Sequence, residues 1–483
     1  MKNQKLSEFN TKERPVFHLT PERGWMNDPN GFSRYDGKYH LFYQVYPDGT
    51  NWGPTHWGHV VSEDLVQWER LPEALTPDRD YDIGGCFSGT ALTSGDGRHM
   101  LMYTGCRPDP EDAKGRGFQT QCIAFGDGVS YSKYEGNPVI TAEQLPEGGD
   151  PYEFRDPKFW REPDGTFRAV IANHNVSNGA QVLLYKSSDG LQWEFESVLA
   201  DGKGKPGWMC ECPDFFPLDG KHVLLTGTMG EVDNILRIGT FERDRGIFRE
   251  ESWQSIEQGF DFYAGQTCCA PDGRRILIGW MQNPQTAERR EIDLPINGQM
   301  SIPRELEIRD GRLLQKPVRE LNDYRTDEMV YRNVKLEAGL EADLETGKAE
   351  TRLDGIAGRT LDLEISIRPE DSYELFRMRF AADGEHYTEF TYEPAESAVT
   401  LDRSHAGPGR TQLVRRQTKV RDRNGQLQLR VILDRLSAEV FINDGEQVMS
   451  AVIYTDRHAE DITFYVKGTA IMDIAKYRIK ENK

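Results

Sequence analysis

The stretch DGKYHLFYQ, from Asp36 to Gln44, decides the fold of this chain. An Asp-Gly pair in front of an alternating apolar run is a strong signal for a β-hairpin, because both residues tolerate the positive φ of a tight turn. The same pattern, an Asp-Gly pair followed by a polar or basic residue and an apolar strand, occurs five times. The other copies begin at Asp96, Asp164, Asp219 and Asp272. Their intervals of 53 to 68 residues suit four-stranded blades, so the sequence predicts a five-bladed β-propeller.

A second repeat supports this interpretation. The segment SEDLVQWE, from Ser62 to Glu69, is echoed about two blades later by SSDGLQWE, from Ser187 to Glu194. Helix-period apolar stretches are scarce here, whereas runs of Val, Ile, Phe, Tyr and Trp bounded by Gly, Pro and Asp are frequent. An ordinary β-sandwich with chance hairpins is the alternative.

The character of the sequence changes after the stretch PREL, from Pro303 to Leu306. The rest of the chain contains no Cys and no Trp, and segments such as 360–367 and 427–433 alternate as strands do in a sheet with one buried face. We therefore predict an all-β chain with two domains, a five-bladed propeller in residues 1–325 and a C-terminal β-sandwich in residues 326–483.

Charge and cysteine content narrow the class of protein. The net charge of −20 over 483 residues repels phosphate backbones and anionic lipid, so neither nucleic acid nor a membrane is expected as a partner. No signal peptide is readable and no run of about 18 apolar residues occurs. The seven cysteines are odd in number and confined to the first 270 residues, which is typical of reduced thiols. A cytoplasmic protein with a neutral substrate is expected.

Three carboxylates lie in unusual sequences at the starts of predicted blades. They are Asp28 in WMNDPNG, Asp156 in EFRDPK and Glu211 in WMCECPDFF. Both Asp residues precede a proline, which holds the backbone extended and fixes the direction of the side chain. Glycoside hydrolysis needs two carboxyl groups in unlike environments, one ionised and one protonated. The three blocks could supply both.

The neighbours in sequence suggest which carboxyl plays which part. We expect Asp28 to stay charged beside the amides of Asn27 and Asn30, and Asp156 to stay ionised beside Arg155. Glu211 lies among Met209, Cys210 and Cys212, where partial desolvation suits a proton donor.

These three blocks closely resemble the motifs of glycoside hydrolase family 32, the β-fructofuranosidases, which include invertases, sucrose-6-phosphate hydrolases, levanases and inulinases. The resemblance begins at WMNDPNG, includes the stretches WGPTHWGH at Trp52 and DFYA at Asp261, and continues to EVFINDG at Glu439. It covers nearly the whole chain. It implies a five-bladed propeller followed by a β-sandwich, in agreement with the repeat count.

The resemblance also implies roles. Asp28 would be the nucleophile of a retaining double displacement, Glu211 the general acid and then base, and Asp156 the stabiliser of the transition state. The fructose subsite would be lined by Asn27, Gln44, Trp52, Phe87, Ser88 and Arg155. No cofactor and no metal is expected, because carboxyl groups protonate the leaving group and meet the positive charge.

Several points stay open at this level. The substrate could be sucrose, sucrose 6-phosphate or a short fructan. Phosphate recognition would call for a basic residue at the rim, with Lys158, Arg107, Arg116 and His174 as candidates. An inverting arabinosidase or xylosidase of the propeller type and a catalytically silent sugar-binding propeller are the alternative functions. Whether the chain forms a homodimer is also open, because the sequence alone does not decide it.

Overall fold

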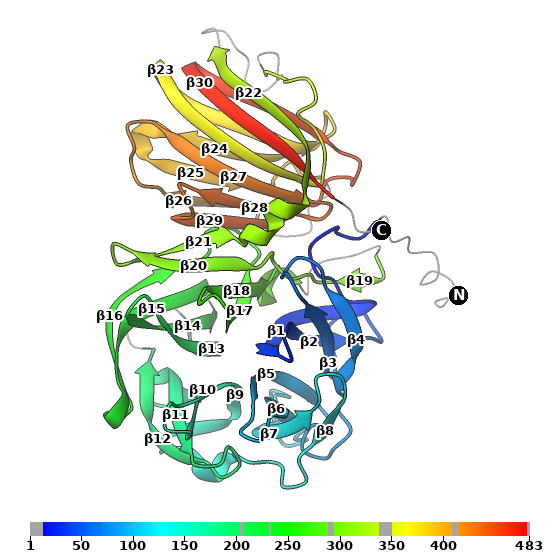
Figure 1. The fold of residues 1–483 in the computed structure, drawn as a ribbon, viewed down its shortest axis with the longest axis vertical. Helices are drawn as coiled ribbons and strands as arrows, with labels where there is room; N and C mark the ends of the chain where they lie inside the picture. Colours follow the sequence, from blue (N-terminus) through cyan, green and yellow to red (C-terminus); the bar gives the residue numbers. More distant parts are fainter. Residues whose placement is uncertain are drawn as a thin grey trace.

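The computed structural model describes residues 13–202, 207–230, 233–287, 294–337, 350–407 and 413–480. Five sheets form a ring, and a sixth, nine-stranded sheet lies against one side of it (Figure 1). Among the described residues the few helices are short, namely η2 (Ala142–Gln144), η3 (Arg243–Arg245), α2 (Pro284–Ala287), η4 (Arg319–Tyr324) and η5 (Pro394–Glu396). The chain is therefore an all-β protein, as predicted.

The five blades follow one another along the chain. Blade 1 contains β1 (Gly24–Tyr35), β2 (Lys38–Tyr46), β3 (His56–Ser62) and β4 (Glu69–Leu75). Blade 2 contains β5 (Gly85–Thr93), β6 (His99–Arg107), β7 (Phe118–Gly126) and β8 (Tyr131–Lys133). Blade 3 contains β9 (Gly149–Arg161), β10 (Phe167–Asn175), β11 (Gly179–Ser187) and β12 (Glu194–Asp201). Blade 4 contains β13 (Met209–Leu218), β14 (Lys221–Met229), β15 (Asp233–Glu242) and β16 (Ile247–Ser255). Blade 5 contains β17 (Tyr263–Cys269), β18 (Arg275–Trp280), β20 (Arg304–Arg309) and β21 (Arg312–Pro317).

Each Asp-Gly pair forms the turn between the first two strands of its blade, so the prediction of five hairpins is confirmed. Two of the pairs, Asp36-Gly37 and Asp219-Gly220, have positive φ at both residues. At the other three pairs only the glycine has positive φ. The glycine therefore supplies the positive φ of the turn in all five copies, and the aspartate does so as well in two of them.

The second repeat also has a structural basis. Ser62 and Ser187 each end the third strand of a blade, and their hydroxyls accept a backbone N–H three residues later at 2.8 Å. The aspartates two residues after them accept further backbone N–H groups. The two segments are the same side-chain-capped turn, which is why the sequence repeats there.

The ring is closed by a short parallel pairing. β19 (Ile296–Asn297), which follows the start of blade 5, pairs with the first residues of β1. The first strands of neighbouring blades, β1, β5, β9, β13 and β17, contact one another around the ring's centre (Figure 1). Residues on these five inner strands therefore converge.

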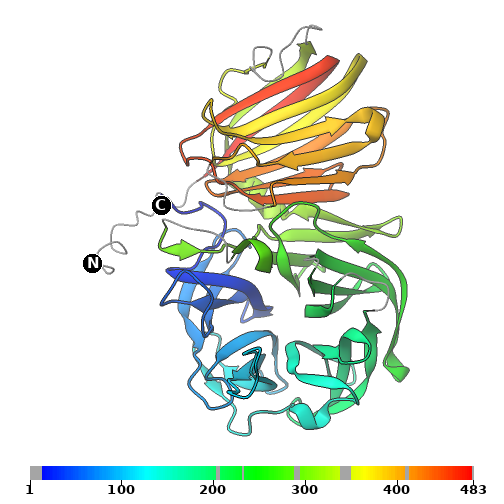
Figure 2. The same ribbon diagram turned by 180° about the vertical axis from the view of Figure 1, so that it is seen from behind.

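The nine-stranded sheet is folded over into a sandwich. It contains β22 (Arg325–Glu337), β23 (Leu361–Ala382), β24 (Thr388–Glu393), β25 (Ala398–Asp402), β26 (Arg415–Lys419), β27 (Leu427–Asp434), β28 (Ser437–Ile442), β29 (Gln447–Val452) and β30 (Asp461–Ile479). The long strands β23 and β30 pair along their length, and β23 pairs with β27 through its first half and with β24 through its second. They thus pass from one layer to the other around a shared apolar core (Figure 2).

A buried polar cluster joins the propeller to the sandwich. We call it the junction cluster, and it consists of His18, Glu257, Arg304, Asp434, Glu439 and Ser450, all buried. The Arg304 guanidinium contacts Glu439 at 2.6 Å and Glu257 at 3.2 Å, and both ring nitrogens of His18 are paired with carboxylates. The sandwich is therefore fixed to the ring, and the predicted boundary after residue 325 stays a prediction.

Candidate active site

A β-bulge interrupts the inner strand of every blade of the propeller. The pairing register shifts between Met26 and Pro29 on β1, Phe87 and Gly89 on β5, Arg155 and Lys158 on β9, Glu211 and Asp214 on β13, and Tyr263 and Gln266 on β17. A bulge inserts an unpaired residue and re-aims its side chain. The five bulges together place polar side chains around one central opening.

That opening is a cavity of about 670 Å³. Eight of the nine predicted site residues line it, namely Asn27, Asp28, Gln44, Trp52, Phe87, Arg155, Asp156 and Glu211. The ninth, Ser88, is buried behind Asp28 and donates its hydroxyl hydrogen to Oδ2 of that carboxylate at 2.6 Å. The structure therefore brings all nine together.

Asp28 is held by hydrogen bonds from side chains on two blades. Asn27 Nδ2 donates to Oδ1 at 3.1 Å, and Gln44 Nε2 lies 3.4 Å from Oδ2. Burial raises the pKa of Asp28, and the charge of Glu211 adds to this, while the bond from Ser88 opposes it. The expected contribution of Asn30 is wrong, because its side-chain amide nitrogen has no hydrogen-bond partner among the described residues and its side-chain oxygen accepts the N–H of Gly89.

Asp156 occupies a strained position at its bulge. Its φ is 64°, and its carboxylate accepts the backbone N–H of Cys212 at 2.9 Å. Burial raises the pKa of Asp156 to about 7, with the charges of Glu211 and Asp28 acting in the same direction and Arg155 opposing them. Arg155 favours the ionised form of Asp156, as expected, but burial and the two neighbouring carboxylates oppose it.

Glu211 is set by two side chains from neighbouring blades. Arg155 clamps Oε1 through Nε at 3.1 Å and Nη2 at 2.9 Å, and the Tyr263 hydroxyl donates to Oε2 at 2.7 Å. Burial and the charge of Glu211 raise the pKa of Tyr263. Of the three neighbours expected to desolvate Glu211, Met209 and Cys210 point into a separate core cluster, whereas Cys212 packs with Tyr263 beside it.

The remaining predicted side chains that line the cavity contact one another. Asn27 accepts from the Trp25 indole at 2.8 Å and donates to Gln44 at 3.0 Å, and Gln44 bonds Ser88 at 2.6 Å. Half-exposed Trp52 packs edge-on against Phe87 with ring centroids 6.0 Å apart. Polar groups that are already paired in this way suit recognition of sugar hydroxyls.

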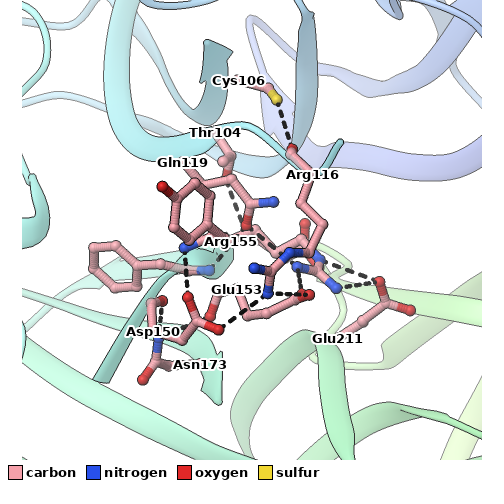
Figure 3. Close-up of polar contacts among 12 residues, drawn as sticks. Thr104, Cys106, Arg116, Gln119, Asp150, Glu153, Arg155, Asn173 and Glu211 are labelled. Atoms are coloured by element: carbon pink, nitrogen blue, oxygen red, sulfur yellow. Dashed lines mark hydrogen bonds and ion pairs between the residues drawn. The ribbon is translucent and has the colours of Figure 1, made fainter. Parts of the chain in front are cut away.

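Sequence reasoning missed three contributors. Tyr263 lies in a stretch that resembles the family but was given no role there. Cys212 directs its thiol between Oδ2 of Asp28 at 3.5 Å and Oδ2 of Asp156 at 3.6 Å. Glu153 contacts Arg155 from the side opposite Glu211 (Figure 3). The sequence signal for Glu153 and Cys212 was their place in the motifs, two residues before Arg155 and directly after Glu211.

Of the four basic residues considered for phosphate recognition at the rim, three contact other parts of the protein. Lys158 donates to Asp214 and to the carbonyl of Thr267. The Arg107 guanidinium lies over Phe118, and His174 packs edge-on against Trp208. Of the four, Arg116 lines the cavity.

Comparison with known proteins gives a consistent result. Residues 18–317 match the glycosyl hydrolases family 32 N-terminal domain and residues 320–481 match its C-terminal domain. A sucrose-6-phosphate hydrolase of Escherichia coli is 32% identical, covering 95% of this chain and 93% of that protein. A raffinose invertase of the same organism is 35% identical over the same shares. The structure of a family 32 β-fructofuranosidase of Bombyx mori superposes with a TM-score of 0.81 at 33% identity, covering 99% of this chain and 96% of that one.

Proposed function

Because this chain belongs to glycosyl hydrolase family 32, we propose that it is a retaining β-fructofuranosidase that releases fructose from terminal β-D-fructofuranosides. The observation that carries this is the meeting of Asp28, Asp156 and Glu211 around one cavity. Relatives named for the hydrolysis of sucrose 6-phosphate and as an invertase support the substrate class. Membership of family 32 separates the chain from the inverting propeller hydrolases, and neither alternative function has support.

The contacts of the three carboxylates suggest how they divide the chemistry. Asp28, with four donors around it, attacks the anomeric carbon and forms a covalent fructosyl-enzyme. Glu211 gives its proton to the departing oxygen and then takes one from the attacking water. Asp156 contacts fructose hydroxyls and stabilises the positive charge that develops on the ring. That charge also favours the ionised form of Asp156 when it is needed.

The side chains around the carboxylates hold the sugar. Asn27, Gln44 and Ser88 fix the orientation of Asp28, and Trp52 and Phe87 present apolar surface to the faces of the sugars. Arg155 fixes Glu211. Half-exposed Trp208, at the mouth of the same cavity, lies where the leaving group would be.

The test is reducing-sugar release from sucrose, sucrose 6-phosphate, inulin and levan by the wild type, Asp28→Ala and Glu211→Ala. We expect the wild type to release fructose with retained configuration and both variants to lose activity by about three orders of magnitude or more. Added azide should accelerate Glu211→Ala when the substrate has a good leaving group, because azide needs no general base. No release by the wild type from any of the four would overturn the proposal.

Cytoplasmic location, a homodimer and the absence of nucleic-acid or membrane partners are also proposed. All seven cysteines lie among the described residues, and each is a free thiol, which favours a reducing compartment. No helix in the described part of the chain is long and apolar enough to cross a membrane. Cell fractionation tests the location, and light scattering of the purified protein tests the dimer.

A further inference from the structure

The general acid of the proposed reaction faces an electrostatic difficulty. Two nitrogens of Arg155 clamp one oxygen of Glu211, and a guanidinium in that position favours the charged carboxylate. A general acid must instead hold its proton until the leaving group departs. Some other group has to weaken the hold of Arg155.

Glu153 is placed to do this. Its Oε2 accepts from Arg155 Nη1 at 2.5 Å, on the side of the guanidinium opposite Glu211 (Figure 3). The Glu153 residue is 4% exposed, so this contact is little screened by solvent. The arginine therefore lies between two carboxylates and divides its charge.

A second arginine holds Glu153 from behind. Arg116 Nη1 lies 3.5 Å from Glu153 Oε1 and 3.1 Å from Asp150, and Asp112 pairs with the same guanidinium. The result is a row of alternating charges from Glu211 through Arg155 and Glu153 to Arg116 (Figure 3). Gln119 completes the setting by accepting from Arg155 Nη1 at 3.2 Å.

We propose that Glu153 is a positioning residue that draws the charge of Arg155 away from Glu211 and so keeps the general acid able to hold its proton. The inference rests on the proposed function. It goes beyond it by giving the row of charges outside the three carboxylates a role in the rate of leaving-group departure.

The groups that face Glu211 set the sign of the pH effect. They are Asp28 on β1, Arg155 and Asp156 on β9, Cys212 on β13 and Tyr263 on β17. Replacing Glu153 by Gln removes a negative charge from this set and returns Arg155 to Glu211. The basic limb of the kcat/KM profile, which reports the coupled group as a whole, should then move to lower pH by about one unit.

The experiment compares Glu153→Gln with the matched variant Glu162→Gln, measured on sucrose and on p-nitrophenyl β-D-fructofuranoside. Glu162 is equally buried, lies at the far end of the same sheet and pairs with Arg168 at 3.0 Å. We expect Glu153→Gln to lower kcat/KM for sucrose by about tenfold or more, and that for the aryl substrate by less than about threefold. An aryl leaving group needs little proton donation, whereas a sugar needs it fully.

Arg116→Gln should shift the pH profile in the direction opposite to Glu153→Gln. It removes a positive charge from the row, so the basic limb should move to higher pH, whatever the change in KM. Equal losses on both substrates with unmoved pH profiles would overturn the inference and leave the proposed function standing. Failure of the wild type on both substrates would overturn the proposed function and the inference with it.

Discussion

Two buried clusters in this protein combine the same kinds of side chain, but one joins the two domains and the other forms the candidate active site. In the junction cluster, Arg304 lies between Glu439 and Glu257, and His18 lies between Asp434 and Glu439. In the active site, Arg155 lies between Glu211 and Glu153. The junction residues are buried, with only a small cavity of about 140 Å³ beside Glu257, whereas the active site opens into a cavity of about 670 Å³.

The pKa shifts of the carboxyl groups differ between the two clusters. Burial opposes ionisation in both clusters. At Asp434 and Glu439 the partners His18 and Arg304 outweigh it and lower the pKa, whereas at Glu257 burial prevails over Arg304 and raises the pKa. In the active site burial prevails, and the pKa of Asp28 and Asp156 is raised. Arginine-carboxylate pairs alone therefore do not identify a catalytic site. Carboxylates outnumber cations in both clusters, three to two at the junction. What marks the active site as a functional candidate is that its carboxyl groups with raised pKa line an open cavity.

The comparison is tested most strongly by exchanging one carboxylate for an amide in each cluster. Asp28→Asn should lower kcat/KM for sucrose by about three orders of magnitude or more, while its unfolding free energy stays equal or rises because a disfavoured buried charge is gone. Asp434→Asn should do the reverse, with a less stable fold and unchanged activity per folded molecule. Enzyme kinetics and urea unfolding measure both.

A stability loss in Asp28→Asn as large as that in Asp434→Asn would remove the distinction between the clusters. Circular dichroism of both variants at low urea verifies that the kinetic assays contain folded protein.

The next largest effect is expected at the centre of the junction. Arg304→Met retains most of the side-chain volume against Phe262 and Phe441. It leaves buried Glu257 without its cation and Glu439 with His18 as its remaining cation. We expect a loss of about 3–5 kcal/mol in the free energy of unfolding. Equilibrium denaturation measures it, and a loss below about 1 kcal/mol would show that the junction does not depend on this charge.

Sequence predicted the parts of this structure that are local. The Asp-Gly turns and the capped turns after Ser62 and Ser187 depend on residues within a few positions, and the blade count followed from them. The active-site carboxylates were also predictable because their motifs are contiguous. The contacts between residues of different motifs were not predictable, because they depend on how neighbouring inner strands are aligned.

Three contacts show this. Arg155 to Glu211, Asp156 to the N–H of Cys212 and Lys158 to Asp214 each join residues 56 positions apart. They reflect two inner strands aligned bulge against bulge, which no single motif encodes. The raised pKa of Asp156 and the position of Glu153 follow from that alignment, and the burial that opposes ionisation of Asp156 does not follow from its neighbours in sequence.

A smaller effect is expected from pH at the junction. Partnership with Asp434 and Glu439 outweighs burial and raises the pKa of His18 to about 9. A raised histidine pKa stabilises the fold fully below the ordinary value of about 6.5, and this contribution is lost as the pH rises through about 9. The difference in unfolding free energy between wild type and His18→Gln should therefore shrink from pH 6.5 to 9.5. A difference that stays constant over this range would contradict the charged form of His18.

The smallest effect is expected from replacing Cys212, whose thiol lies between two of the proposed catalytic carboxylates. Its sulfur lies 3.5 Å from Asp28 and 3.6 Å from Asp156, and a hydroxyl in its place forms a shorter, stronger hydrogen bond to a charged carboxylate. Cys212→Ser should therefore favour the ionised forms, move the acidic limb of the sucrose profile to lower pH and change kcat by less than about tenfold. Cys268→Ser, at another buried thiol in blade 5, should leave the profile in place. If both variants shift it alike, the thiol acts through packing and not through its bond to the carboxylates, and the charge balance of the active site then depends on Arg155 and its two glutamates alone.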